Sequence, residues 1–200
     1  MKVKSLLSIA ALALMANSSA WAVPIHYEGA ITTNAPNGPA IPVTGSVGGF
    51  SIFDDDPSGV DFWSFSALAG QNIFVRVVRL ASALDPIAYL YSGTTTADVS
   101  AWPSIRDLSI GQSFGGLTLI AFNDDALAPP NNLGPAGDPF FVIRAPVTGL
   151  YTLLVAGIGS DADPAGGLPY RATVAVPLPA TLPLVLLALG SLGWTLRRRG

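Results

Sequence analysis

The chain has 200 residues, a formal net charge of −3 at neutral pH and no cysteine, so it forms neither disulfides nor thiolate metal sites. Only five of its basic residues, all arginines, lie between the two charged termini, and with all 13 acidic residues they give this region a formal charge of −8. Because nucleic-acid binding requires clustered lysine and arginine to neutralise phosphates, the composition excludes a nucleic-acid partner.

The N-terminus has the three parts of a secretory signal peptide. Lys2 and Lys4 give a positively charged start, Leu6 to Ala16 form an apolar stretch, and Ala20-Trp21-Ala22 is a small-x-small cleavage site. We therefore expect residues 1–22 to be a signal peptide that signal peptidase removes. The mature chain is expected to be exported across the inner membrane and to begin at Val23.

Residues 23–49 are rich in Gly, Pro, Asn and Thr, with brief apolar pieces at Ile25 to Tyr27 and Ile41 to Val43. This composition predicts one or two strands joined by loops. The mature chain before the tail has about 150 residues, which is a usual size for one domain with a single core. We therefore expect one domain over residues 50–176, preceded by this N-terminal segment.

From residue 50 onward, short runs of β-branched and aromatic residues are separated by Gly, Pro, Asp and Asn, which is the pattern of β-strands. Trp63 and Phe65, for example, fall on one face of their run because side chains alternate along a strand. No helical periodicity occurs between the two termini, so we predict an all-β domain, an antiparallel β-sandwich or jelly roll. The eight runs are Phe50–Phe53, Asp61–Ser66, Ile73–Leu80, Ile87–Tyr91, Leu117–Phe122, Phe140–Ala145, Gly149–Ala156 and Tyr170–Val176.

Acidic residues cluster at three places in this domain, and adjacent carboxylates repel one another unless a cation offsets the repulsion. Ca²⁺ is the candidate cation, because it takes oxygen ligands and the chain has no His or Cys set for a transition metal. The clusters are Asp54 to Asp56 with Asp61, Asp124 and Asp125 with Asp138, and Asp161 with Asp163. The candidate calcium ligands are Asn123, Asp124, Asp125, Asp138 and Asp61, brought together from separate loops.

A second interpretation of these residues stays open. Asp and Asn are common in turns because their side chains accept hydrogen bonds from nearby backbone N–H groups. This interpretation is favoured for Asp54 to Asp56 and for Asp161 with Asp163, and it is balanced against metal binding at Asn123 to Asp125. An EF-hand loop is excluded, because Glu28 is the only glutamate in the chain.

Few residues suggest catalysis. His26 is the only histidine, and the chain has no G-x-S-x-G sequence to supply a nucleophile, so we predict that the protein is not an enzyme. A pair of aspartates acting on matrix glycans is the alternative, which would make the protein a secreted hydrolase. Trp102, beside Pro103 in the long segment 92–116, is a possible ligand contact: its indole stacks on a sugar ring or covers the end of the sandwich.

The C-terminus has the composition of a membrane anchor. Residues 178–196 carry no charge and are about as long as the ~20 residues that cross a bilayer. Arg197, Arg198 and Arg199 follow at once, and the positive-inside rule places them in the cytoplasm. We therefore predict a transmembrane helix over 178–196 within a tail of residues 177–200.

This tail resembles the PEP-CTERM sorting signal. The resemblance lies in Val176-Pro177-Leu178-Pro179-Ala180, followed by the apolar stretch and the arginine cluster, with Leu178 in place of the glutamate usual in that family. It implies that an exosortase-type enzyme of Gram-negative bacteria that make exopolysaccharide processes the chain. The alternative is that the tail is never cut, so that the domain stays permanently anchored in the periplasm or at the cell surface.

The central region resembles the bacterial pre-peptidase C-terminal domain, a β-sandwich found in many exported proteins. That resemblance implies the same fold and adds weight to calcium, since related domains bind it. It rests on segments 61–65, 69–73, 84–91, 120–125 and 145–151.

These observations predict an exported, non-catalytic β-sandwich that is anchored by its tail and then reaches the cell surface or the exopolysaccharide matrix. There we expect it to act as a binding or structural module, with exopolysaccharide as a possible partner. A passive matrix component is a further possibility that the residues leave open.

Overall fold

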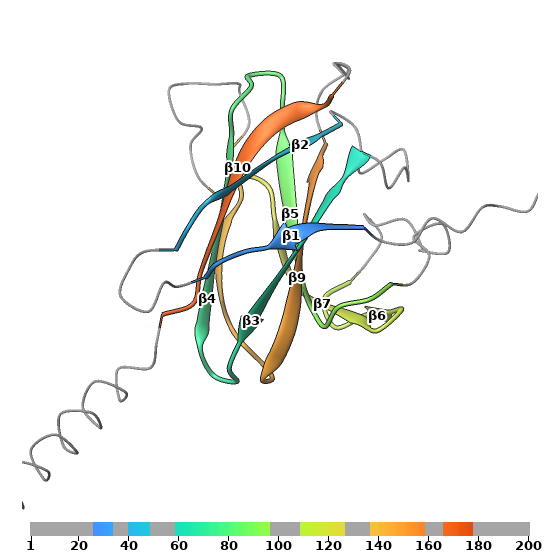
Figure 1. Cartoon of the computed structure of the whole chain (residues 1–200), viewed down its shortest axis with the longest axis vertical. Helices are drawn as coiled ribbons and strands as arrows, with labels where there is room; N and C mark the ends of the chain where they lie inside the picture. The colour runs from blue at the N-terminus through green and yellow to red at the C-terminus, as the bar shows by residue number, and fades with distance from the viewer. Residues whose placement is uncertain are drawn as a thin grey trace, which may run out of the picture.

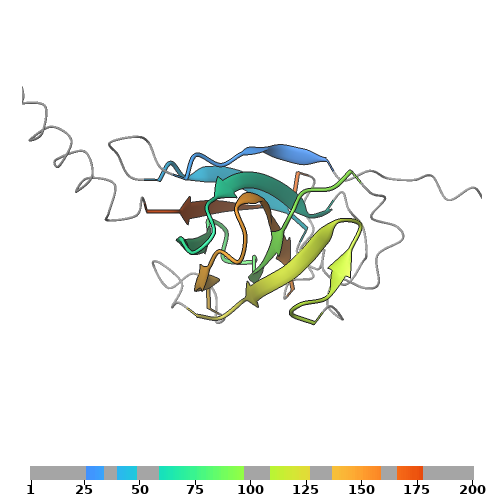
Figure 2. The same cartoon turned by 90° about the horizontal axis from the view of Figure 1, so that it is seen from below.

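The structure, a computed structural model, describes residues 26–33, 40–48, 59–96, 109–126, 137–158 and 166–177. These residues form ten β-strands in two sheets that pack face to face (Figures 1 and 2). Within these ranges no helix is long and apolar enough to span a membrane. The predicted signal peptide, the predicted strand Phe50–Phe53 and the predicted transmembrane helix lie outside them.

The larger sheet has six strands and the smaller has four. In spatial order the larger contains β1 (Tyr27–Ala30), β3 (Asp61–Ala67), β9 (Gly149–Gly157), β5 (Pro86–Ser92), β7 (Leu117–Asn123) and β6 (Ser113–Phe114). The smaller contains β2 (Val43–Val47), β10 (Leu168–Ala175), β4 (Asn72–Arg79) and β8 (Phe140–Arg144). All pairs are antiparallel except β1 with β3, which is parallel. The predicted all-β sandwich is therefore confirmed.

Alternating side chains build the main core between the sheets. Trp63 and Phe65 of β3 point inward with Val75 and Val77 of β4, and all four are buried. The larger sheet carries a second apolar cluster on its other face, formed by Phe62, Tyr89, Leu119, Leu154 and neighbouring residues. Its central strands are thus buried on both faces, which explains why Ile87–Tyr91 is an unbroken apolar run.

Polar side chains join the two sheets at one point of this core. Trp63 Nε1 on β3 donates a hydrogen bond to Tyr170 Oη on β10, at 2.7 Å. The Tyr170 hydroxyl donates in turn to Asp61 Oδ2, back on β3, at 2.6 Å. The backbone N–H of Ser46 on β2 donates to the same carboxylate oxygen, at 3.1 Å. We call Asp61, Trp63, Tyr170 and the Ser46 N–H the inter-sheet network; it connects three strands from both sheets.

The seven strands predicted from Asp61 onward appear with bounds that differ by at most two residues. The sequence did not predict β6, which has only two residues, or the parallel pairing of β1 with β3. The segment before residue 49 contributes one edge strand to each sheet, β1 to the larger and β2 to the smaller.

The inter-sheet network leaves no room for a side chain at position 45. A Cβ on Gly45 would meet the carboxylate of Asp61 and the hydroxyl of Tyr170, and the Tyr170 ring is fully buried and has nowhere to move. We therefore expect Gly45→Ala to lower the free energy of unfolding by about 1–3 kcal/mol, measured by chemical denaturation.

Gly149→Ala is the matched control, because a Cβ there meets nothing within 4 Å. We expect this second variant to stay within about 1 kcal/mol of the parent protein. Equal stability of the two alanine variants would contradict the close approach at Gly45.

Candidate functional site

The two ends of the sandwich differ in chemistry. The six acidic residues that the structure describes all lie at or near one end, where β3 and β5 begin and β4 and β7 finish; they are Glu28, Asp61, Asp85, Asp124, Asp125 and Asp138. We call this the acidic end. The opposite end consists of the β3–β4 turn, the β8–β9 turn and the exit of the chain at Val176 and Pro177, and we call it the tail end.

A buried arginine lies at the centre of the acidic end. Arg79, the last residue of β4, is 1% exposed, and its Nε donates to Asp138 Oδ1 at 2.7 Å. Its Nη2 donates to the carbonyl of Gly137 and lies 3.5 Å from Asp85 Oδ1. Arg79 therefore supplies positive charge to two carboxylates from two different loops.

Two of the other candidate ligands, Asn123 and Asp125, accept hydrogen bonds from the backbone of neighbouring segments. Asn123 Oδ1 accepts hydrogen bonds from the N–H groups of Ala126 (3.0 Å) and Phe140 (3.3 Å). Asp125 Oδ1 accepts from the N–H of Gly137, at 2.6 Å. These are the backbone bonds expected if Asn and Asp are present for turn chemistry.

The arrangement fits a calcium ion poorly in the part of the chain that the structure describes. There, no three His, Cys, Asp or Glu side chains are placed to hold a metal ion. Asp138 Oδ2 is buried without a hydrogen-bond donor among these residues, but Arg79 already brings a positive charge to the other oxygen of that carboxylate. Calcium binding by this loop cluster stays a prediction from the sequence.

Asp61 lies apart from the other four candidate ligands. In the larger sheet Asp61 pairs with Val155 on β9, Val155 pairs with Ala88 on β5, and Ala88 pairs with Asn123 on β7. Three strand spacings, roughly 14 Å, therefore separate Asp61 from Asn123. The structure thus brings Asn123, Asp124, Asp125 and Asp138 to neighbouring loops and places Asp61 in the inter-sheet network.

Burial controls the protonation of the inter-sheet network. Burial raises the pKa of Asp61 to about 6; the hydrogen bond from Tyr170 lowers this pKa, and the nearby charge of Glu28 raises it. Burial and the nearby Asp61 charge raise the pKa of the Tyr170 hydroxyl, so this group stays protonated and donates. At the acidic end, the pKa of Asp85 lies above its ordinary value because of burial, and the charge of Arg79 offsets only part of this rise.

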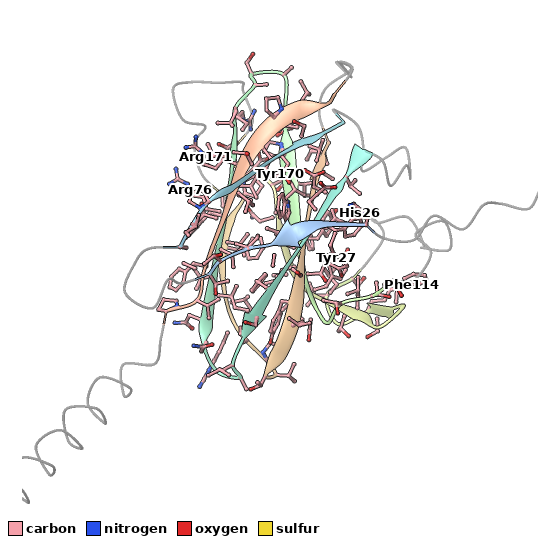
Figure 3. The ribbon with its side chains drawn as sticks, viewed as in Figure 1. His26, Tyr27, Arg76, Phe114, Tyr170 and Arg171 are labelled. Atoms are coloured by element: carbon pink, nitrogen blue, oxygen red, sulfur yellow. The ribbon has the colours of Figure 1, made fainter. Side chains whose placement is uncertain are left out.

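Other residues singled out in the sequence fall in different places. Val176 is buried and Pro177 is exposed. The carbonyl of Pro177 accepts a hydrogen bond from Gln71 Nε2 at 3.3 Å. His26 is exposed and directly precedes β1 (Figure 3). Outside the described residues lie Trp102, Leu178, Pro179, Ala180, Arg197, Arg198, Arg199, Asp54 to Asp56, Asp161 and Asp163.

Sequence reasoning missed Arg79 and Tyr170. A signal for Arg79 was present, because it continues the alternation of Ile73, Val75 and Val77 and so falls on the inward face of β4. Figure 3 shows the contrast with Arg76 and Arg171, which project from the outer side of the same sheet.

Two grooves lie toward the tail end. One, of about 490 Å³, is lined by residues that include Ser66, Leu68, Gln71 and Val176. The other has the same volume and is lined by Tyr27, Ser64, Thr94 to Thr96 and Leu150. Neither is lined by a carboxylate among the described residues.

The raised pKa of Asp61 predicts a pH dependence of stability. Folded Asp61 binds a proton more tightly than the unfolded chain, whose carboxyl has a pKa of 3.8, so the free energy of unfolding falls as pH rises from about 4 to about 6. Asp61→Asn keeps an oxygen that accepts from Tyr170 and Ser46 but cannot ionise. Between these pH values we therefore expect the free energy of unfolding of the variant to fall by about 2 kcal/mol less than that of the parent protein. Denaturation at several pH values measures this difference. Identical pH profiles of the two proteins would contradict a buried, titrating Asp61.

Loss of the Arg79 charge predicts a large destabilisation. Arg79→Met leaves Asp138 buried without its partner, so we expect the free energy of unfolding to fall by about 3–5 kcal/mol. Adding Asp138→Asn should restore part of the loss, because the unpaired charge is then removed. The control is Arg171→Met on the exposed outer side of β10, expected within about 0.5 kcal/mol of the parent protein. A similar cost for both arginines would count against the buried ion pair.

Comparison with solved structures supports the fold. The surface-associated copper-binding protein CorA, important in copper acquisition by Methylomicrobium album BG8, is similar with a TM-score of 0.50 and 14% identity, over 76% of this chain and 98% of its own. PliG of Aeromonas hydrophila, a periplasmic inhibitor of g-type lysozyme, has a TM-score of 0.41 and 16% identity, over 72% and 91%. The pre-peptidase C-terminal domain of a Bacillus anthracis collagenase has a TM-score of 0.34 and 16% identity, over 74% and 96%. At 14% identity the likeness to CorA concerns the fold alone, and the TM-scores of the other two structures are too low to add to it.

The sequence itself gives the more specific match. No curated protein matches the chain. The model of the PEP-CTERM protein-sorting motif matches residues 175–199, which confirms the sorting signal expected from Val176 to Ala180 and the arginine cluster. The chain therefore carries a PEP-CTERM sorting motif, which implies export and membrane anchoring before processing.

Proposed function

We propose that the protein is an exported, non-catalytic β-sandwich that the tail holds at the membrane until an exosortase-type enzyme removes it. The domain then acts as a binding or structural module at the cell surface or in the exopolysaccharide matrix. One observation carries the proposal: the sorting motif begins at residue 175, which is also the last residue of β10. The last strand and the sorting motif therefore share a single residue, Ala175.

The junction between them is abrupt. Val174 and Val176 are buried in the main core, whereas Pro177 is exposed. A cut beyond Pro177 would thus remove none of the buried side chains of the described domain. This supports a tail that serves delivery and is dispensable to the folded protein.

The polar groups of the acidic end support a non-catalytic role. Asp61 and Asp138, its two most buried carboxylates, bond to Tyr170 and to Arg79 and so serve the packing of the sandwich. The rival function, hydrolysis of matrix glycans, requires two carboxyl groups facing a substrate. No carboxylate is present among the described residues that line the two grooves.

Mass spectrometry of the protein produced in an exosortase-containing Gram-negative host tests the proposal. We expect the form recovered from the culture medium to lack Arg197 to Arg199. In a strain without the enzyme, the intact chain should stay in the membrane fraction. An intact arginine terminus on released protein would overturn the sorting role, and an intact chain in the membranes of both strains would favour the permanent anchor.

Truncation provides the matched structural control. A chain ending at Pro177 should keep the stability of the full-length protein. A chain ending at Thr173 loses the buried side chains of Val174 and Val176, and we expect its free energy of unfolding to be about 3 kcal/mol lower or more.

A further inference from the structure

The tail end presents apolar side chains to solvent. Leu68 on the β3–β4 turn, Val147 on the β8–β9 turn and Leu150 at the start of β9 are 51%, 51% and 52% exposed. Leu68 and Leu150 also line the groove to which Val176 contributes. In Figure 1 both turns and the end of β10 lie at the lower end of the sandwich. The chain therefore leaves the domain beside its exposed leucines.

Little chain separates this end from the expected anchor. Gln71, in the segment between β3 and β4, donates to the carbonyl of Pro177 and so fixes the point of exit. The expected helix spans residues 178–196, and only the four residues 178–181 separate Pro177 from Leu182, where the run LPLVLLALGSLGWTL begins. Even fully extended, the chain from Pro177 to Leu182 reaches about 18 Å, so an anchored tail keeps this end of the domain close to the bilayer surface.

The distribution of charge favours the same orientation. In the described part of the chain, the acidic residues are those of the acidic end, and the tail end has none. It does have Arg144, exposed at the end of β8, whose Nε donates to the carbonyl of Gly70 at 3.2 Å. Anionic lipid headgroups attract basic groups and repel acidic ones within about a Debye length, so this arrangement turns the acidic end away from the membrane.

We propose that, while the tail anchors the chain, the tail end of the sandwich rests on the lipid surface, with Leu68, Val147 and Leu150 at the level of the headgroups. The inference rests on the proposed function, because it requires an anchored tail. Leucine and valine side chains at this depth lose contact with water, and the neighbouring arginine stays beside the phosphates. The anchored protein is thus a domain lying on the bilayer and not one that swings freely above it.

Site-specific labels test this orientation, because the chain has no cysteine of its own. Leu68→Cys places a fluorophore at the tail end. Leu80→Cys places the same fluorophore at the acidic end, on a leucine that is 42% exposed. Each full-length variant is reconstituted into vesicles of phosphatidylethanolamine and phosphatidylglycerol that contain a headgroup-level nitroxide lipid. We expect the label at position 68 to be quenched at least threefold more than the label at position 80.

Flotation of the vesicles separates the two possible failures. Equal quenching of both labels on protein that floats with the vesicles would overturn the inference and leave the anchored tail intact. Protein that does not float would overturn both. Quenching at position 68 that appears only at high protein density, together with energy transfer between labels, would assign the surface to a second copy instead.

A charge substitution completes the test. Leu150→Glu puts a carboxylate on the proposed contact surface at an exposed position, so the fold is retained. We expect it to reduce the quenching at position 68 at least twofold, whereas Leu80→Glu should leave that quenching unchanged. Equal effects of the two glutamates would contradict contact with the lipid at this end.

Discussion

The hydrogen bond from Tyr170 to Asp61 determines how the two sheets face each other. It joins β10 to β3 across the core, and both groups are withdrawn from water, so a displaced register would leave a buried carboxylate without its donor. The same requirement explains Gly45, the residue without a side chain on the strand that passes over the pair. A polar contact thus specifies an alignment that apolar packing alone would leave less defined.

The buried ion pair of Arg79 and Asp138 lies beside the inter-sheet network. Tyr170 and Arg79 are neighbours in register on β10 and β4, so their side chains occupy adjacent positions at the same end of the core. One end of the sandwich is therefore fixed by charges and hydrogen bonds, and the other is closed by short turns with exposed apolar residues. This difference gives the molecule a direction from which its orientation on a membrane can be inferred.

The sequence predicted the strands well because their signals are local. Alternation in Ile73–Leu80, and the glycine, proline, asparagine or aspartate beside most of the runs, place strands without knowledge of their partners. The role of Asp61 could not be predicted in this way, because its donor Tyr170 is 109 residues away. At Asn123 to Asp125 the sequence alone leaves a cation site and turn chemistry in balance, because nothing local reveals that Arg79 lies beside these loops. The sorting motif was recognised because it is linear and needs no fold.

The position of β10 constrains how the protein is made. This last strand is not an edge: it lies between β2 and β4, so the smaller sheet stays in two pieces until residues 168–175 are in place. During export in the N-to-C direction these residues emerge last, immediately ahead of the hydrophobic tail. Under the proposed anchoring, completion of the fold coincides with the arrest of the tail in the membrane, so the smaller sheet is incomplete while the chain crosses it.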